Sequence, residues 1–348
     1  MKIFIIRSTG LEINNDIGWF YHKTLDRLGY ENVMFNHKEI VNKNLLLKKG
    51  INLFWNKIIS RNLIDLYKLA NKKFMELIEN FKPDLILDVS GKTIMPSLIK
   101  QVKEKFKQVL FVGHFCDNPL FYDPPFRTIP FYDYFFVKDT YVLMQLKKLG
   151  ATNVDYLPQA CDPKIHRPIE NMNEEDREYY GSDLCFIGSM YPYRVRILEI
   201  FKDYNLKIWG SDWRGDIPKD SVAFTKHQYK WVVGKEKSKV ITASKICINT
   251  HNPQNDIFGV NKRVFEYAGA GGFQIVDRKK DLGNLFKIDE EIICFNSQDE
   301  LKQLVDYYLK RPQEREAIAK KAYERARKEH TYHHRIKELL EIVKRGER

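Results

Sequence analysis

The sequence predicts an α/β protein made of two doubly wound domains in tandem, each with a parallel sheet. Short β-rich runs alternate with amphipathic helical stretches along the chain, which is typical of strands joined by helical crossovers. The 348 residues suffice for two domains that each bury a core, and apolar residues make up 43% of them. A polar, linker-like stretch between two series of strands completes the argument.

The first series predicts an N-terminal domain over residues 1–165. Its expected strands are residues 2–7, 31–36, 84–89, 108–115 and 132–139. Helical patterns at 16–28 and 140–149 lie between them.

The second series predicts a C-terminal domain over residues 183–330. Its expected strands are residues 183–189, 206–210, 245–251, 273–277 and 291–295. An acidic segment with little apolar periodicity, residues 166–182, is predicted to be the linker. Residues 331–348 predict a helix, and its return to the first domain is one option.

Composition limits the classes of partner. The 58 Lys and Arg against 46 Asp and Glu give a net charge of +12, which indicates an anionic partner: a nucleotide, a nucleic acid, a membrane surface or an acidic glycan. The five cysteines form no C-x-x-C pair, so a zinc site or disulfide framework is not expected and a reducing cytoplasm fits best. No long uncharged apolar run predicts a membrane span.

The stretch "GVNKRVFEYAGAGGFQIVDR" predicts either a phosphate site or a capped helix that simply ends. Gly259, Val260 and Asn261 would begin a helix whose free N–H groups suit a diphosphate, with Arg263 beside them and Glu266 able to bind ribose hydroxyls. In the alternative, the glycines terminate the helix and its charges form an exposed i,i+4 pair. Spacing alone favours neither.

Two further stretches end predicted strands with polar groups. In "FIGSMYPYRVR", Ser189 and Arg194 follow the first strand of the second domain, a usual approach point for phosphate, although no G-x-G-x-x-G is present. In "CINTHNPQNDIFG", Asn249 and His251 could read a base or sugar. The alternatives are a solvated arginine and ordinary turn residues.

Together these stretches resemble the CgeB (spore maturation) family of glycosyltransferases. The combination of G-V-N, R-x-F-E, A-G-A-G-G-F and H-T-Y-x-x-R from Lys245 onward carries the resemblance, and "FIGSMYPYRVRILEIF" extends it upstream. The family is similar to group 1 sugar-nucleotide glycosyltransferases with the GT-B fold. That fold comprises two Rossmann-like domains that face a central cleft, with the donor bound mainly by the second domain and the acceptor by the first.

The resemblance implies roles for matching residues. Glu266 stands where related retaining enzymes place a ribose-binding glutamate, and Arg263 with the amides of 259–261 would contact the diphosphate. Ser189 and Arg194 would contact the same phosphates. Related enzymes often carry another glutamate eight residues earlier, where this chain has Phe258. The sugar contact of that glutamate is therefore unassigned, with Asp256 and Asn255 as weak substitutes, and retention of configuration is expected only loosely.

Acceptor-side residues are predicted from "GHFCDNPLFYDPP". His114 and Asp117 follow a strand, and either is a candidate to take the proton of the acceptor hydroxyl. In the alternative, Asp117 caps a turn and His114 is bonded within a loop. Because no D-x-D triplet occurs, no metal or other cofactor is expected, and cationic side chains would stabilise the leaving group.

The sequence therefore predicts a cytoplasmic, metal-independent glycosyltransferase that moves a sugar from a nucleoside-diphosphate sugar to an acceptor hydroxyl. The alternative is a non-catalytic module on a degenerate GT-B fold that binds a nucleotide sugar or a glycan. A basic stretch between Lys43 and Lys82 could contact an anionic acceptor or the inner face of a membrane, or be only the solvated face of a helix. No specific nucleic-acid motif is present.

Overall fold

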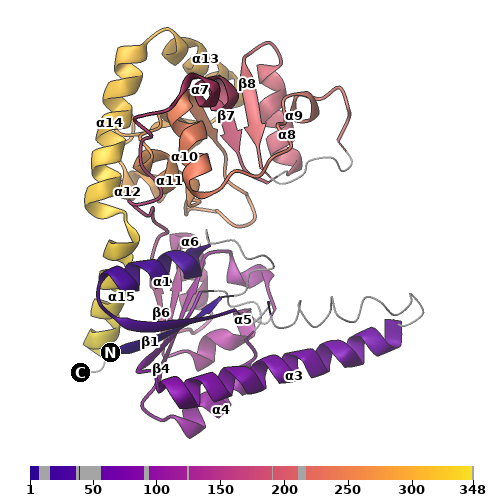
Figure 1. The fold of residues 1–348 in the computed structure, drawn as a ribbon, viewed down its shortest axis with the longest axis vertical. Coiled ribbons are helices and arrows are strands. Elements are labelled where there is room, and N and C mark those ends of the chain that lie inside the picture. The colour runs from indigo at the N-terminus through magenta and orange to yellow at the C-terminus, as the bar shows by residue number, and fades with distance from the viewer. Residues whose placement is uncertain are drawn as a thin grey trace. The chain divides into compact units, whose positions relative to one another are not determined.

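The computed structural model describes residues 1–7, 16–36, 39, 56–89, 94–123, 125–189, 191–210 and 217–346, with the backbone alone over 56–67 and at 346. The chain divides into two compact units (Figure 1). The first comprises Met1–Leu157 and Ile336–Arg348, and the second comprises Pro158–Arg335. Each unit contains one parallel sheet, so the predicted fold class is confirmed.

The first unit has a six-stranded sheet in the order β2-β1-β3-β4-β5-β6. Its strands are β1 (Lys2–Arg7), β2 (Glu31–Asn36), β3 (Leu85–Asp88), β4 (Leu110–Phe115), β5 (Tyr134–Val137) and β6 (Val154–Tyr156). All neighbouring pairs among these strands are parallel. The sequence did not predict β6, because its three residues are too few to show a period.

Both faces of this sheet are covered, because alternate strand residues point to opposite sides. Phe4 and Ile6 of β1 belong to a core that includes Phe74 of α3 and Leu98 of α4. Ile3 lies on the other side with residues of α1 and α15. The helices of this unit are α1 (Ile17–Arg27), α3 (Asn56–Phe81), α4 (Pro96–Lys105), α5 (Pro125–Thr128) and α6 (Thr140–Lys148), with 3-10 turns Pro119–Phe121 and Ile129–Phe131.

The second unit has a five-stranded parallel sheet in the order β11-β10-β9-β7-β8. Its strands are β7 (Ser182–Ile187), β8 (Leu206–Trp209), β9 (Ser244–Asn249), β10 (Gln274–Asp277) and β11 (Ile293–Phe295). Its helices are α7 (Glu174–Tyr180), α8 (Pro192–Leu198), α9 (Val222–Thr225), α10 (Gly234–Ala243), α11 (Arg263–Gly269), α12 (Leu282–Leu285), α13 (Gln298–Leu309) and α14 (Pro312–Glu329), with a 3-10 turn Glu199–Phe201.

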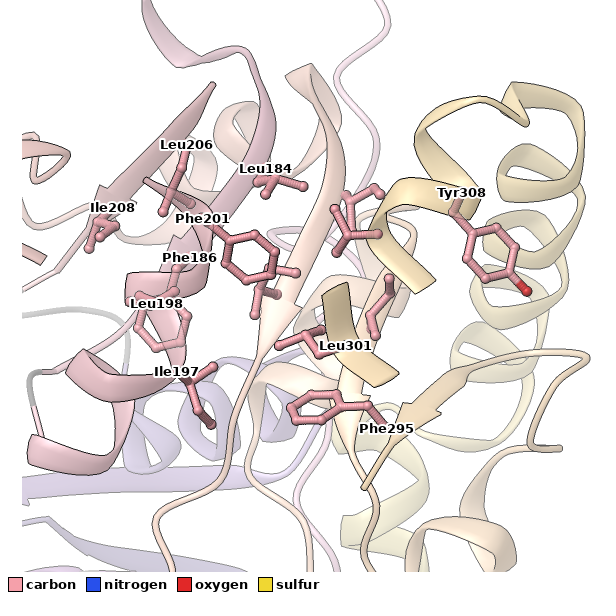
Figure 2. Close-up of a cluster of buried hydrophobic side chains, with 14 of the residues drawn as sticks. Leu184, Phe186, Ile197, Leu198, Phe201, Leu206, Ile208, Phe295, Leu301 and Tyr308 are labelled. Carbon is pink, nitrogen blue, oxygen red and sulfur yellow. The ribbon is translucent and has the colours of Figure 1, made fainter. Parts of the chain in front are cut away.

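Two apolar clusters cover the two faces of this sheet. On one face, Phe186 of β7 packs with Leu198 of α8 and Leu301 of α13 (Figure 2). On the other, Cys185 of β7 packs with residues of α10 and α11, among them Tyr267. The alternation of Cys185 and Phe186 between these clusters is that of a strand buried on both faces.

Two boundaries differ from the expected ones. The units divide at Leu157 rather than at residue 165, and the expected linker lies inside the second unit, where it forms α7. A hydrogen bond of 2.7 Å from the Tyr180 hydroxyl to Glu236 of α10 ties α7 to this unit. Helix α15 (Tyr332–Gly346) begins in the second unit, and its residues from Ile336 onward belong to the first.

The H-T-Y-x-x-R motif at the start of α15 has a structural role. Arg335 donates to the carbonyls of Pro158 and Gln159 at 2.9 and 3.2 Å, and to Nδ1 of His330 at 2.9 Å. His330 Nε2 donates to the carbonyl of Leu285 at 2.7 Å. The motif thus fastens the beginning of the second unit to the end of α14.

Candidate active site

The predicted donor-binding residues lie at or after the carboxyl ends of two neighbouring strands, β7 and β9. Asp277, which no prediction included, ends the next strand, β10. Ligands of open parallel sheets bind at this edge. The topology therefore brings together residues that are up to about ninety positions apart in the sequence.

Arg194 lies on α8 and is only 5% exposed. Its Nε donates to the hydroxyl of Thr250 at 3.2 Å, its Nη2 to the carbonyl of Thr250 at 3.0 Å, and its Nη1 to the carbonyl of Ser189 at 2.7 Å. Burial, and then the positive charge of Arg263, lowers the pKa of Arg194 to about 9. The side chain of Ser189 is exposed, and its carbonyl orients the arginine.

Arg263 reaches the same carbonyl from the other side of the sheet edge. It begins α11 and donates from Nη2 to Thr250 O at 2.6 Å and from Nη1 to Ile187 O at 2.7 Å. A Cβ at Gly188 would lie 2.5 Å from Nη1 of Arg263. Glycine at position 188 therefore makes room for this guanidinium.

Neither guanidinium forms an ion pair with a described carboxylate, although the charge of Asp256 acts on Arg194 from a greater distance. Among the described residues, no carboxylate oxygen lies within the 4.0 Å of an ion pair with Arg194 or Arg263; the pairs that form are elsewhere. A guanidinium has five N–H groups, so both arginines keep donors that their carbonyl partners do not use. Two buried positive charges, held by carbonyls, the hydroxyl of Thr250 and the ring of Phe186, form a site suited to an anion.

Glu266 is completely buried in a second cluster of charges. Its Oε2 accepts a 2.9 Å hydrogen bond from Lys237 of α10. Its Oε1 lies 3.5 Å from Lys262 Nζ and 3.5 Å from His166 Nε2, beyond good hydrogen-bond geometry, and has no hydrogen-bond donor. The expected alternative of an exposed pair with Lys262 is therefore wrong, because the carboxylate is inside the unit.

The protonation of this cluster follows from its geometry. Burial raises the pKa of Glu266, but Lys237, Lys262 and His166 outweigh it and hold the pKa far below its usual value. Burial is also the first cause that lowers the pKa of His166 to about 4, so this imidazole is neutral near pH 7. The cluster therefore holds an ionised carboxylate between two lysines.

His251 and Asp277 form a third group at this edge. His251 is fully buried, and its backbone N–H and its Nδ1 approach Oδ1 of Asp277 at 2.8 and 2.6 Å. Burial raises the pKa of Asp277, but His251 and Lys279 lower it overall, so the carboxylate is ionised and accepts. Nδ1 therefore carries the proton. The opposite nitrogen, Nε2, is buried and has no hydrogen-bond partner.

Other predicted residues support the loops. Asn261 donates to Asn249 Oδ1 at 3.0 Å, and Asn249 donates to Gln274 at 3.4 Å, so these amides join the end of β9 to the start of α11. Gly259 is buried, and Val260 is part of an apolar core. Helix α11 begins at Arg263, after the residues expected to begin it, so the amides of 259–261 are not helix N-terminal donors.

The acceptor-side candidates lie in the first unit. His114 is 1% exposed; its Nδ1 bonds the Tyr21 hydroxyl at 2.8 Å and its Nε2 bonds the carbonyl of Leu157 at 3.0 Å. Because a carbonyl only accepts, Nε2 carries the proton and Nδ1 accepts from Tyr21. The lone pair that a general base needs is therefore occupied. Asp117 lies two residues beyond β4 and is partly exposed.

Position 258 offers no carboxylate. The ring of Phe258 lies under Lys280, whose Nζ is 4.7 Å from its centroid. Of the two suggested substitutes, Asp256 is 3% exposed and its carboxylate accepts the backbone N–H of Asn252 at 3.1 Å, which closes a turn. Asn255 contributes its backbone N–H to the same turn, with Asn252 O at 3.0 Å.

Sequence reasoning gave no role to four residues of this edge: Thr250, Lys237, His166 and Asp277. Lys237 carried a usable signal, since it lies three and four positions before Val240 and Ile241, on the buried stripe of α10. A lysine on an apolar stripe needs a buried anion. Thr250 acts mainly through its backbone carbonyl, which no side-chain pattern could reveal.

The described ranges also bear on metal binding, on membrane spanning and on the basic stretch. They contain no group of three or more His, Cys, Asp or Glu arranged to hold a metal ion. None of their helices is long and apolar enough to cross a bilayer. Of the basic stretch between Lys43 and Lys82, residues 43–55 lie outside the described residues, whereas Lys72 and Lys73 are exposed on α3.

Comparison with known proteins identifies the class. Residues 194–341 match the family model described as "Glycosyl transferase-like". Two solved structures superpose over 99% of this chain with a TM-score of 0.67: sucrose-phosphate synthase from Thermosynechococcus elongatus (10% identical, 98% of that chain) and Anabaena HepE in complex with UDP and glucose (12% identical, 99% of that chain). Residues 194–341 are therefore similar to glycosyl transferases, and the chain as a whole has the GT-B fold of these solved structures.

A closer relative in sequence confirms the predicted resemblance. The chain is 25% identical over 275 residues to the spore protein CgeB of Bacillus subtilis strain 168, which covers 74% of this chain and 83% of that protein. The similarity extends well beyond residues 194–341, so it includes part of the first unit.

Proposed function

We propose that this enzyme transfers a sugar from a nucleoside-diphosphate sugar to an acceptor hydroxyl, without a metal ion and with retention of the anomeric configuration. The observation that carries the proposal is the pair of buried guanidiniums of Arg194 and Arg263, which have no carboxylate partner among the described residues. A diphosphate would supply the missing negative charge. The same cations would stabilise the charge that develops on the departing diphosphate.

Further observations support this donor. Glu266 Oε1 is a buried acceptor without a hydrogen-bond donor, as a ribose contact requires. HepE, whose fold this chain shares, has been solved with UDP and with UDP-glucose. We infer that a uridine nucleotide is the first donor to test, with Ser189 and the backbone of 259–261 beside the phosphates.

On the acceptor side we propose Asp117, rather than His114, as the residue that orients or deprotonates the acceptor hydroxyl. Both ring nitrogens of His114 are engaged with Tyr21 and Leu157, whereas Asp117 is partly exposed at the end of β4. Asp117→Asn should lower the transfer rate by about tenfold or more and leave the Kd for UDP unchanged. Equal transfer rates in the variant and the wild type would remove Asp117 from the mechanism.

The enzymatic proposal and a purely binding role are separated by turnover. The protein is incubated with UDP-glucose, UDP-galactose, UDP-N-acetylglucosamine and GDP-mannose, with and without chelator, and release of the nucleoside diphosphate is measured. Slow, chelator-resistant hydrolysis that Arg263→Ala abolishes is the expected result. Tight binding with no turnover, even with an added cell-extract acceptor fraction, would favour the non-catalytic module.

We propose a cytoplasmic location, with a peripheral anionic contact through the basic stretch that begins at Lys43. Reversal of Lys72 and Lys73 to glutamate, both exposed on α3, should abolish salt-sensitive binding to vesicles of phosphatidylglycerol and phosphatidylcholine. Reversal of Lys147 and Lys148, exposed at the end of α6, is the matched control. Wild-type protein that ignores lipid and salt would remove this contact.

A further inference from the structure

We infer that His251, held by Asp277, accepts a hydrogen bond from a hydroxyl of the transferred sugar. This inference rests on the proposed donor site and assigns a specific function to a buried pair within it. Asp277 is then a positioning residue, and His251 Nε2 is the atom that touches the sugar.

Asp277 determines which ring nitrogen of His251 carries the proton. Oδ1 of Asp277 receives both the backbone N–H and Nδ1–H of His251, at 2.8 and 2.6 Å. These two bonds to one oxygen fix the ring orientation and the tautomer. In the neutral imidazole, Nε2 then has a lone pair and no proton, so it can only accept.

The other ring nitrogen of His251, Nε2, is a buried acceptor without a donor. His251 is 0% exposed, and Nε2 has no hydrogen-bond partner. A buried acceptor without a donor destabilises the unliganded protein. The hydroxyl of a bound sugar is a neutral donor that would recover this cost, whereas a phosphate oxygen has no proton to give at neutral pH.

The groups at this edge of the sheet belong to both of its faces. Both guanidiniums meet at the carbonyl of Thr250, the residue directly before His251. Glu266 belongs to α11, one of the helices on the face that Val276 packs against. Because alternate strand residues point to opposite faces, Asp277 points to the other face, which α8 covers. Its nearness to α8 agrees with the pKa of Tyr193 on that helix, which burial raises most and the charge of Asp277 raises further.

The edge therefore presents an acceptor, a pair of cationic donors and a second acceptor. Glu266 belongs to a helix on one face of the sheet, and Asp277, which holds His251, points to the other face. Both guanidiniums bind the carbonyl of Thr250, the residue before His251. A sugar nucleotide has the complementary order: ribose hydroxyls, two phosphates, and the hydroxyls of the transferred sugar. If the ribose binds at Glu266 and the diphosphate binds at the two arginines, the transferred sugar lies next to His251.

The test compares UDP with a UDP-sugar, since only the second carries the group that His251 is inferred to bind. Dissociation constants are measured by calorimetry for UDP and for whichever of UDP-glucose, UDP-galactose and UDP-N-acetylglucosamine the wild type binds most tightly. His251→Phe should leave the Kd for UDP within about twofold and weaken the UDP-sugar about tenfold, the size of one hydrogen bond. His251→Gln, which restores an acceptor, should recover much of the loss.

Asp277→Asn provides a second variant in case His251→Phe does not fold. It should weaken the UDP-sugar by about three- to tenfold and spare UDP, because an amide no longer fixes the tautomer by charge. Deoxy analogues of the sugar locate the contact: one of them should lose about tenfold with the wild type and nothing further with His251→Phe.

Failure of the sugar contact and failure of the proposed function give different results. If His251→Phe and Asp277→Asn weaken UDP and the UDP-sugar by the same factor, or weaken neither, the sugar contact is wrong and the donor site stands. If the wild type binds neither UDP nor any sugar nucleotide of the panel, the proposed function fails, and the inference fails with it.

Discussion

The two sheets differ in whether the buried polar residues at their strand ends find partners inside the protein. In the first unit, buried Arg7 forms an ion pair with Asp16 at 3.0 Å, although its Nε has no hydrogen-bond partner. Both ring nitrogens of His114 are hydrogen-bonded within the unit. In the second unit, Arg194 and Arg263 have no such carboxylate among the described residues, and acceptors on Glu266 and His251 have no donor.

The presence or absence of an internal partner distinguishes polar groups that stabilise the fold from polar groups that can bind a ligand. Buried polar groups in folded proteins are almost always hydrogen-bonded, and buried charges are almost always paired. A buried charge that the protein itself pairs, as Asp16 pairs with Arg7, is explained by folding alone. A strand end that leaves charges and acceptors incomplete is explained by a molecule that completes them, and here that molecule has the chemistry of a sugar nucleotide.

The largest effect on stability is expected at Glu266, which pairs with Lys237 inside the unit and also has an oxygen without a hydrogen-bond donor. Glu266→Gln removes the charge that Lys237 is paired with inside the unit, and leaving a buried charge unpaired costs about 3–5 kcal/mol. The free energy of unfolding by urea should fall by that amount. The control is Glu236→Gln on α10, whose pair with Lys230 is partly exposed and should cost less than about 1 kcal/mol. Equal losses would show that the Glu266 cluster is not a buried charge network.

A smaller effect is expected from His330 on the pH dependence of stability. Burial, and then Arg335, lowers its pKa from 6.5 to about 4. Between those values the unfolded chain binds a proton that the native protein does not, so stability is lost as the pH falls from about 7 to about 4. A pKa lowered from 6.5 to about 4 corresponds to about 3 kcal/mol of stability at most.

His330→Gln should flatten that part of the stability curve, and the exposed His333→Gln is the control. His166, whose pKa burial also lowers to about 4, should retain its own share of the slope in both variants. Curves of identical slope for His330→Gln and the wild type would contradict the assignment of Nδ1 as the acceptor of Arg335.

The smallest of these effects is expected at Tyr21 in the first unit. Tyr21→Phe leaves Nδ1 of His114 without its donor and should cost about 1–3 kcal/mol of stability. The Kd for UDP should not change, because the bond is structural. A change in transfer rate larger than the change in stability explains would return His114 to the mechanism as a base.

Much of the fold could be predicted from the sequence because its signals are local. Strands such as Lys2–Arg7 and Glu31–Asn36 are short β-rich runs bounded by polar residues, and the structure has them at the predicted positions. The three-residue β6 and the place of α7 could not be predicted, since the first shows no period and the second depends on tertiary contacts such as Tyr180 with Glu236.

The site was predictable in part for the same reason. Arg194, Arg263, Glu266 and His251 stood out because polar residues after strands gather at one sheet edge. Their partners did not, since Thr250 acts through its carbonyl and Lys237 comes from a helix earlier in the chain. Whether His114 was free or engaged depended on Tyr21, 93 positions away.

The most direct test of the donor site is calorimetric titration of UDP into the wild type, Arg263→Ala and Arg315→Ala. Arg315 is also a buried arginine that donates to backbone carbonyls, those of Tyr308 and Leu309, but it lies on α14, where its electrostatic neighbours include Asp183 at the amino end of β7. We predict that Arg263→Ala weakens UDP about 30- to 100-fold through the loss of charge-assisted hydrogen bonds, while Arg315→Ala binds UDP like the wild type. Equal affinity in all three proteins, with Arg263→Ala folded, would contradict a diphosphate site at the guanidinium pair.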